Sequence, residues 1–254
     1  MDETTELKFK DYFSQHAEIY SRSRPGYPTE LFDFLAKISP DTKLAWDCAT
    51  GNGQAALSLS DYFEHVIASD ASKEQISHAI QRKNILYMVV PAEHSSITEK
   101  TVDLITVATA IHWFKLEEFY QEVNRVLKPN GVIAVWAYDC PMVTEKINKV
   151  ILHLSNNILK NYWPKEVKMV NNRYQHLPFP FQSILTPKFI TKRNWNMEQL
   201  MDFMMSWSSS QNYLQITKKN PLDLITSRLK EAWEDPNQER EVCWEIYLKA
   251  GKKT

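Results

Sequence analysis

The chain is poor in cysteine. Three cysteines occur in 254 residues, at Cys48, Cys140 and Cys243, and no two of them have the spacing of metal ligands. An odd number of scattered cysteines argues against the disulfide framework of a small secreted protein. We therefore expect a protein of a reducing compartment that binds no metal.

The chain also lacks an excess of one charge and lacks long apolar runs. Thirty Lys and Arg residues face 31 Asp and Glu residues, a formal net charge of -1, so the total favours neither nucleic acid nor an anionic membrane. No apolar run approaches the ~20 residues that span a bilayer, and the opening MDETTELKFK has no signal-peptide core. We expect a soluble, cytoplasmic protein, a monomer or weak homodimer, with no membrane and no nucleic-acid partner.

What the chain does have is an alternation of strand-like apolar runs and amphipathic, helix-length segments through its first 140 residues. This alternation is typical of a parallel sheet with crossover helices. The predicted strands are 43–49, 65–70, 85–90, 102–110 and 132–138. The predicted helices between them are 53–63, 72–83 and 116–127. The pattern indicates an α/β, Rossmann-like fold with a doubly wound sheet.

The composition changes after Tyr138, where helix-length segments rich in Met and aromatic residues follow. Segments 145–163 and 197–214 each predict one helix, and the apolar spacing in the second favours packing within a cap. Two late strands, 188–195 and 241–250, are predicted to return as a final pair and complete a seven-stranded sheet.

These observations divide the chain into three predicted parts. The parts are a core with an N-terminal lid segment (1–140), a helical cap with a late strand, inserted after the fifth strand (141–240), and a final strand returning to the sheet (241–254).

Residues 47–53, DCATGNG, place two of the five glycines in a turn between a predicted strand and a predicted helix. Open α/β folds bind nucleotides at such turns, and Gly51 and Gly53 allow a ligand to approach the backbone. Asp70 ends the next predicted strand, where its carboxylate can accept both hydroxyl hydrogens of a ribose. Two cofactors fit: a dinucleotide, for which Ala56 stands at the third glycine position, and S-adenosylmethionine, whose cation favours an acid at Asp47.

The segment LAWDCATGNGQAALSL resembles the first motif of class I S-adenosylmethionine-dependent methyltransferases, with Ala49 where that family usually has its first glycine. The segments IASDAS, PAEHSSI, VDLITVATAIHWF and EVNRVLKPNGVIAVW resemble the later motifs, and five motifs in order are specific. More narrowly, YSRSRPGYP, AIHWF and SWSSSQNY resemble the small-molecule branch that includes trans-aconitate methyltransferases.

The resemblance implies a set of cofactor-binding residues. They are Tyr20, Arg24, Asp47, Ala49, Gly51, Gly53, Asp70, Ala71, Ala92, Glu93 and Ala108. In this set Asp70 holds the ribose, Glu93 lies beside the adenine, and the segment of Tyr20 and Arg24 folds over the methionine end. Plainer roles stay open: Asp70 as a helix cap, Glu93 as an exposed loop acid and Arg24 as the cap of a surface turn.

His112 is the candidate catalytic residue because it directly follows the fourth predicted strand, where the reactive methyl would point. An ordinary imidazole titrates near neutrality, so His112 could take a proton from a hydroxyl or hold a substrate carboxylate. Alternatively, His112 and Trp113 form a structural corner. Cys140 is not expected to be a nucleophile, because the chemistry of RNA cytosine methyltransferases needs its cysteine at the fourth-strand motif.

We predict an enzyme that moves the methyl group of S-adenosylmethionine to a small-molecule acceptor, a carboxylate or a hydroxyl, by in-line displacement. The Asn-Pro-Pro-Tyr tetrapeptide of DNA amino-group methyltransferases is absent from the chain. Two alternatives stay open: a catalytically silent protein that binds a cofactor or a partner, and a nicotinamide-dependent oxidoreductase.

Overall fold

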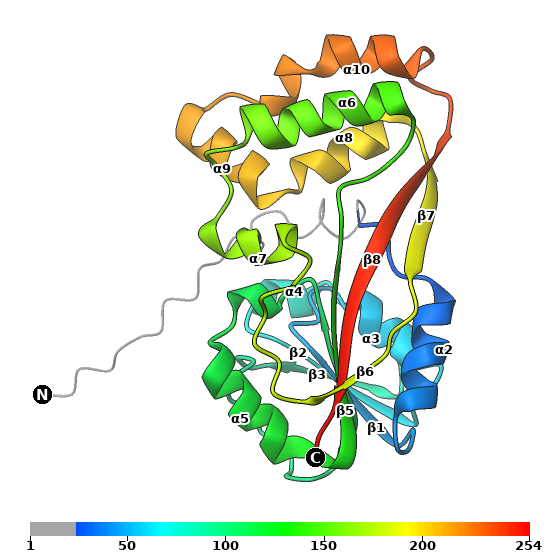
Figure 1. Ribbon diagram of the computed structural model, residues 1–254, viewed down its shortest axis with the longest axis vertical. Coiled ribbons are helices and arrows are strands. Elements are labelled where there is room, and N and C mark those ends of the chain that lie inside the picture. Colours follow the sequence, from blue (N-terminus) through cyan, green and yellow to red (C-terminus); the bar gives the residue numbers. More distant parts are fainter. Residues whose placement is uncertain (1–23) are drawn as a thin grey trace, which may run out of the picture.

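The computed structural model describes residues 24–254, so the predicted role of Tyr20 lies outside the described residues. Its centre is one sheet in the order β3-β2-β1-β4-β5-β8-β6, with β7 paired to β8 (Figure 1). β1 to β5 run parallel, and β8 runs antiparallel to β5. The strands are β1 (Leu44–Cys48), β2 (His65–Asp70), β3 (Ile85–Val89), β4 (Val102–Ala108), β5 (Leu127–Tyr138), β6 (Gln182–Ile184), β7 (Phe189–Trp195) and β8 (Arg240–Lys252).

The sheet has eight strands where the sequence predicted seven. β6 pairs with the end of β8, at Ala250–Lys252, and β7 pairs with its beginning, at Arg240–Ile246, both on the edge of β8 that faces away from β5. The intervening residues 185–188 make no ladder pairs with β8, although the Thr186 hydroxyl donates to the Leu248 carbonyl, and they include Pro187, which has no N–H to donate to a ladder. β6 and β7 therefore share the seventh position of the sheet.

Helices cover both faces of the sheet, as a doubly wound fold requires. α2 (Thr29–Ile38) and α3 (Gln54–Leu59) pack on one face, and α5 (Leu116–Val126) packs on the other (Figure 1). The strands alternate accordingly: Ala45 faces α2 and α3, while Trp46 lies in the cluster with Phe119 of α5. The predicted α/β, Rossmann-like architecture is confirmed.

Three boundaries of the predicted core elements were wrong by more than two residues. α3 ends at Leu59, before the predicted residue 63. α4 ends at Ser77 (Lys73–Ser77), well before the predicted residue 83, and the chain then turns so that the Asn84 amide donates to the Ser60 carbonyl of the preceding helix, at 2.8 Å. β5 begins at Leu127, because Leu127 pairs with Val102 before a bulge in the ladder. The Pro and Gly of KPNG, predicted to precede the strand, therefore lie within it.

The cap helices form a layer above the carboxyl ends of the parallel strands (Figure 1). Their buried side chains make a cluster of their own, which includes Trp195 of β7 and Trp244 of β8. The cap elements are α6 (Glu145–His153), η3 (Leu154–Ile158), η4 (Lys165–Val167), α7 (Lys168–Asn171), α8 (Met197–Met205), α9 (Ser208–Thr217), η5 (Pro221–Leu224) and α10 (Thr226–Trp233). One further short helix, η2 (Ile111–Trp113), follows β4 in the core.

Both long cap helices predicted from the sequence are interrupted. The first changes after His153 into one π-helical turn, η3, which ends at Ile158. The second ends at Met205, and α9 starts after Trp207, whose backbone is extended. The Ser206 hydroxyl donates to the Phe203 carbonyl at 2.7 Å and so competes with the helix at this break. The Met and aromatic side chains of α8 pack within the cap, as predicted, but Phe203 also borders the cavity under the cap.

Candidate active site

The glycine turn after β1 takes a conformation that only a few residue types adopt. Gly51 and Gly53 have φ angles of +58° and +87°, and Ala49 has a φ of +54°. A Cβ on Gly53 would collide with the Tyr87 hydroxyl of β3. Ala49 therefore stands in left-handed backbone at the family's glycine position, where a residue with a Cβ is strained. The departure from glycine at this position therefore has a backbone cost.

Asp47 lies at the end of β1, only 1% exposed, and its carboxylate is used within the protein. It accepts hydrogen bonds from the hydroxyl of Thr50 in the turn and, at 2.7 Å, from that of Thr106 in β4. Burial raises the pKa of Asp47 to about 6, although these hydrogen bonds oppose the rise. The predicted acid of the turn thus ties the turn to two neighbouring strands.

Asp70 lies at the end of β2 and faces the same turn. Its carboxylate oxygens accept the Gly51 N–H at 2.9 Å and the Ser72 N–H at 2.8 Å. Ser72, and not Asp70, is the N-cap of α4, because its hydroxyl accepts from Gln75. The structure therefore brings Asp47, the two glycines and Asp70 together, while Ala71 follows Asp70 in a half-buried position.

The loop after β3 carries the residues predicted to lie beside an adenine. Ala92 is buried against the core, and the Glu93 carboxylate accepts the N–H of Lys115 at 2.9 Å, where α5 begins. Glu93 therefore has a structural partner. Whether it also contacts a cofactor stays a prediction.

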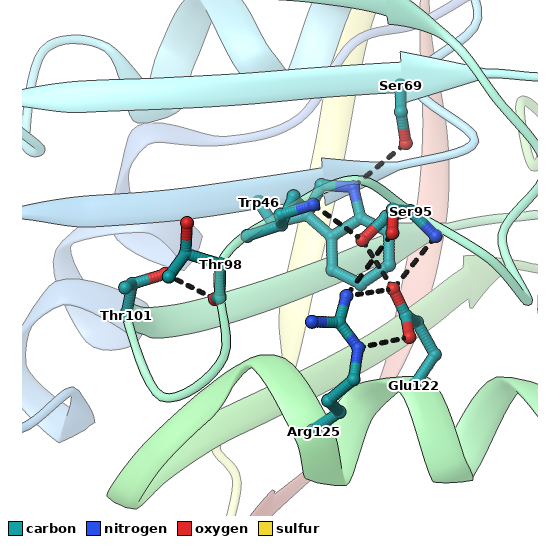
Figure 2. A network of polar contacts seen from close by, with 8 residues as sticks. Trp46, Ser69, Ser95, Thr98, Thr101, Glu122 and Arg125 are labelled. Carbon is teal, nitrogen blue, oxygen red and sulfur yellow. Dashed lines mark hydrogen bonds and ion pairs between the residues drawn. The ribbon is translucent and has the colours of Figure 1, made fainter.

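A polar network that the sequence analysis missed fixes this loop to α5 (Figure 2). Glu122 accepts the Ser95 N–H at 2.8 Å, and the Arg125 guanidinium donates to both Glu122 oxygens and to the Ser95 carbonyl. Burial alone would raise the pKa of Glu122, but the hydrogen bonds from Arg125 and Ser95 outweigh it and hold the pKa below its ordinary value. No motif signals this network, because its members come from two distant segments.

Two cavities meet at the carboxyl edge of the sheet. A small one, of about 40 Å³, lies over the glycine turn and is also bordered by Ala108 at the end of β4. A larger one, of about 570 Å³, lies between this edge and the cap helices. Arg24, Thr109 and Tyr138 border both cavities. A ligand on the turn and a ligand under the cap would therefore meet at these three side chains.

Two residues at this shared boundary stand out, Arg24 by its contacts and Thr109 by its backbone conformation. The Arg24 guanidinium donates to the Tyr138 hydroxyl and lies 5.6 Å from the ring centre of Phe203 in α8, so it contacts both core and cap. Thr109 has a φ of +58°, rare for a β-branched residue. Within residues 24–254 its buried hydroxyl has no hydrogen-bond partner. Strained residues with unpaired polar groups tend to occur at functional sites.

His112 lies in η2, is 7% exposed and borders the large cavity together with Trp113. Burial lowers the pKa of His112 to about 3, so the ring is neutral at physiological pH. Its Nδ1 lies 3.2 Å from the hydroxyl of Tyr174, which follows α7. The sequence analysis missed Tyr174, because 62 residues separate the two side chains and no spacing rule connects them.

Six aromatic side chains form part of the wall of the large cavity. Its aromatic residues are Trp113, Tyr138, Trp163, Phe203, Trp207 and Tyr247. One acid also borders it, Asp139, which is paired with the guanidinium of Arg173. Between Arg24 and the last residue, no cluster of His, Cys, Asp and Glu could hold a metal ion, and no helix is long and apolar enough to cross a membrane.

Comparison with known proteins gives consistent results. The family model described as a methyltransferase domain matches residues 46–135. A protein of Dictyostelium discoideum described as a methyltransferase is 28% identical, with 98% of this chain and 97% of that protein aligned. CRG1 of Saccharomyces cerevisiae, described as an S-adenosylmethionine-dependent methyltransferase, is 26% identical over 94% of each chain. The solved structure of a protein of Anaeromyxobacter dehalogenans described as a type II methyltransferase superposes with a TM-score of 0.85 at 34% identity, covering 90% of this chain and 97% of that one.

Proposed function

Because the chain belongs to the class I S-adenosylmethionine-dependent methyltransferases, we propose that it methylates a small-molecule acceptor bound in the large cavity. The size and position of that cavity carry the proposal. About 570 Å³ is typical of small-molecule sites, and Thr109 and Tyr138 form its boundary with the glycine turn. Room for an acceptor beside the turn argues against a catalytically silent binding protein.

The residues of the turn fit S-adenosylmethionine. Gly51 and Gly53 expose backbone at which a ligand can lie, and the Asp70 carboxylate faces the same turn, where it can accept hydrogen bonds from ribose hydroxyls. When bound, this cofactor supplies a methyl group activated by its sulfonium. Glu93 and Ala108 are proposed to border the adenine and the methyl-bearing end.

The chain's own residues then position the acceptor and exclude water. The aromatic side chains of the cavity wall and the Arg24–Tyr138 contact enclose the boundary between the cavities, and a water-poor site strengthens the electrostatic interactions within it. Arg24 brings a positive charge to this boundary, which favours an acceptor with a carboxylate or hydroxyl oxygen. The in-line displacement needs chiefly alignment of that oxygen.

A binding screen followed by an activity assay tests the proposal. Thermal-shift measurements with S-adenosylhomocysteine and a panel of acids, phenols and amines should reveal an acceptor, and isotope-labelled methyl transfer should then confirm it. Calorimetry should show binding of S-adenosylhomocysteine and none of NAD. The opposite result would revive the oxidoreductase alternative and refute the proposal.

A pair of leucine variants tests the location of the acceptor. Leu152 borders the large cavity, whereas Leu224 is similarly exposed but does not. Leu152→Trp should obstruct the cavity, slow methyl transfer and leave affinity for S-adenosylhomocysteine unchanged. Leu224→Trp is the matched control and should change neither quantity. Equal activity in the two variants would place the acceptor elsewhere.

A further inference from the structure

Tyr174 is fully buried and held in an uncommon backbone conformation. Arg173 and Tyr174 both have left-handed φ angles, +51° and +54°, and consecutive non-glycine residues rarely adopt them. The Tyr174 N–H donates to the Met169 carbonyl at 3.0 Å, and its ring packs edge-on against Tyr247, with 5.6 Å between the ring centres. The result is a phenol hydroxyl fixed beside the His112 ring.

The hydroxyl of Tyr174 and Nδ1 of His112 are each other's hydrogen-bond partners, and within residues 24–254 neither atom has a second. Two arrangements fit the 3.2 Å separation. If Nδ1–H donates to the phenol oxygen, the buried phenol proton has no acceptor, which is unfavourable. If the phenol donates to a bare Nδ1, the phenol proton and Nδ1 are both satisfied, and the donor that remains is on a ring that borders the large cavity. The second arrangement requires the ring proton of neutral His112 to be on Nε2.

We propose that Tyr174 fixes His112 in the Nε2–H form, so that His112 is a hydrogen-bond donor to the methyl acceptor and does not act as its base. Nε2 makes no hydrogen bond to the described part of the chain, and His112 borders the large cavity. Tyr174 is then a positioning residue that acts through His112. This proposal rests on the proposed function, because it names the residue that donates a hydrogen bond to the methyl acceptor in that cavity.

A donor at this position restricts the chemistry of the acceptor. The molecule that accepts the methyl group must offer a lone pair to the hydrogen bond from Nε2–H. Its nucleophilic oxygen must also be reactive without losing a proton to His112. Of the two acceptor groups proposed above, a carboxylate meets both conditions. In that step an oxygen lone pair forms the O–CH₃ bond, the S–CH₃ bond breaks, and its electron pair stays on sulfur as a neutral thioether. The carboxylate becomes a neutral ester, and no proton moves.

The form of His112 can be measured without any substrate. Long-range ¹H–¹⁵N correlation spectra distinguish protonated from bare ring nitrogens, and the His112 signals are those that disappear in His112→Gln. We expect a protonated Nε2 and a bare Nδ1 in the wild type, and a mixture of both forms in Tyr174→Phe. The matched control is Tyr120→Phe, because Tyr120 donates to the Pro178 carbonyl and does not contact His112. A protonated Nδ1 in the wild type would overturn the proposal, whether or not Tyr174→Phe folds.

A second test distinguishes a hydrogen-bond donor from a general base at His112. It uses the methyl acceptor that the thermal-shift screen identifies. The amide nitrogen of Gln can replace Nε2–H as a donor but cannot accept a proton at neutral pH. If His112 is a donor, His112→Gln should retain kcat/KM within about tenfold, and His112→Leu should lose more. Loss of a general base would cost roughly 10²–10⁴-fold in both variants and would refute the proposal. Failure to bind S-adenosylhomocysteine would instead refute the proposed function and leave the NMR result standing.

Discussion

Replacing Asp70 by alanine tests the predicted ribose site most directly. A hydrogen bond to a charged acceptor contributes ~1.5–3 kcal/mol, and a ribose would lose two of them. Water in the truncated site offsets part of this loss, so we expect about 2–3 kcal/mol, or roughly 30–150-fold weaker affinity for S-adenosylhomocysteine. Isothermal calorimetry measures this change without an acceptor.

The structure adds a second effect to this variant. Asp70 also accepts the N–H groups of Gly51 and Ser72, so Asp70→Ala should lower the stability of the free protein as well. Asp70→Asn keeps an acceptor oxygen for the turn but loses the charge, and it should fall between wild type and Asp70→Ala in both measurements. Asp61→Ala is the matched control, because Asp61 pairs with Arg82 at the surface. Unchanged affinity in a folded Asp70→Ala protein would place the ribose elsewhere and refute the reasoning.

Three further variants test the turn and the loop beside it. Ala49→Gly should raise the melting temperature, because the ~1–2 kcal/mol of left-handed strain exceeds the ~0.4–1 kcal/mol of added unfolded-state entropy; a lower melting temperature would contradict this. Gly53→Ala should weaken S-adenosylhomocysteine binding, because a φ of +87° is strained for alanine and the new Cβ would displace the Tyr87 hydroxyl; unchanged affinity would contradict this. Glu122→Gln should destabilise the protein at neutral pH. Since the folded-state pKa of Glu122 is lowered, its contribution is present above the unfolded pKa of ~4.3 and is lost as pH falls through the folded pKa. The stability difference between wild type and Glu122→Gln should therefore shrink below about pH 4, and a constant difference would contradict this.

Local signals made the core predictable. Each parallel strand is a short apolar run, and the turn after β1 contains its own glycines, so the positions of Asp47 and Asp70 at one edge followed from the strand pattern. The cap was less predictable, because helix periodicity continues across its breaks. The sequence gives no warning of the π-helical turn after His153, and the break at Ser206 depends on one side-chain hydrogen bond.

The sequence predicted which residues meet at the glycine turn, but it did not predict the side-chain contacts under the cap, and both outcomes have the same cause. The glycine turn is built within one short segment, whereas the His112–Tyr174 and Arg24–Tyr138 contacts join residues 62 and 114 positions apart. Such pairs depend on how the cap segments pack over the sheet. The motif AIHWF placed His112 at the edge of β4, but its hydrogen-bond partner and neutral state appear only with that packing.

The long strand β8 explains how a cap made from two separate segments keeps its position over the turn. Ala250, near its end, lies in the core cluster with α2 and α3, whereas Val242 and Trp244, near its beginning, lie in the cap cluster. β7 pairs with β8 along seven residues from Trp195 to Phe189, so the two strands enter the cap as one ladder. Moving the cap as a body would break this ladder or bend it. At the cavity boundary the contact between core and cap is made by side chains, because the Arg24 guanidinium donates to the Tyr138 hydroxyl and lies near the Phe203 ring. We therefore expect that S-adenosylhomocysteine protects the backbone from hydrogen exchange at residues 24–27 and at the glycine turn more than in β7 and β8, and stronger protection of β7 and β8 would show that the cap moves instead.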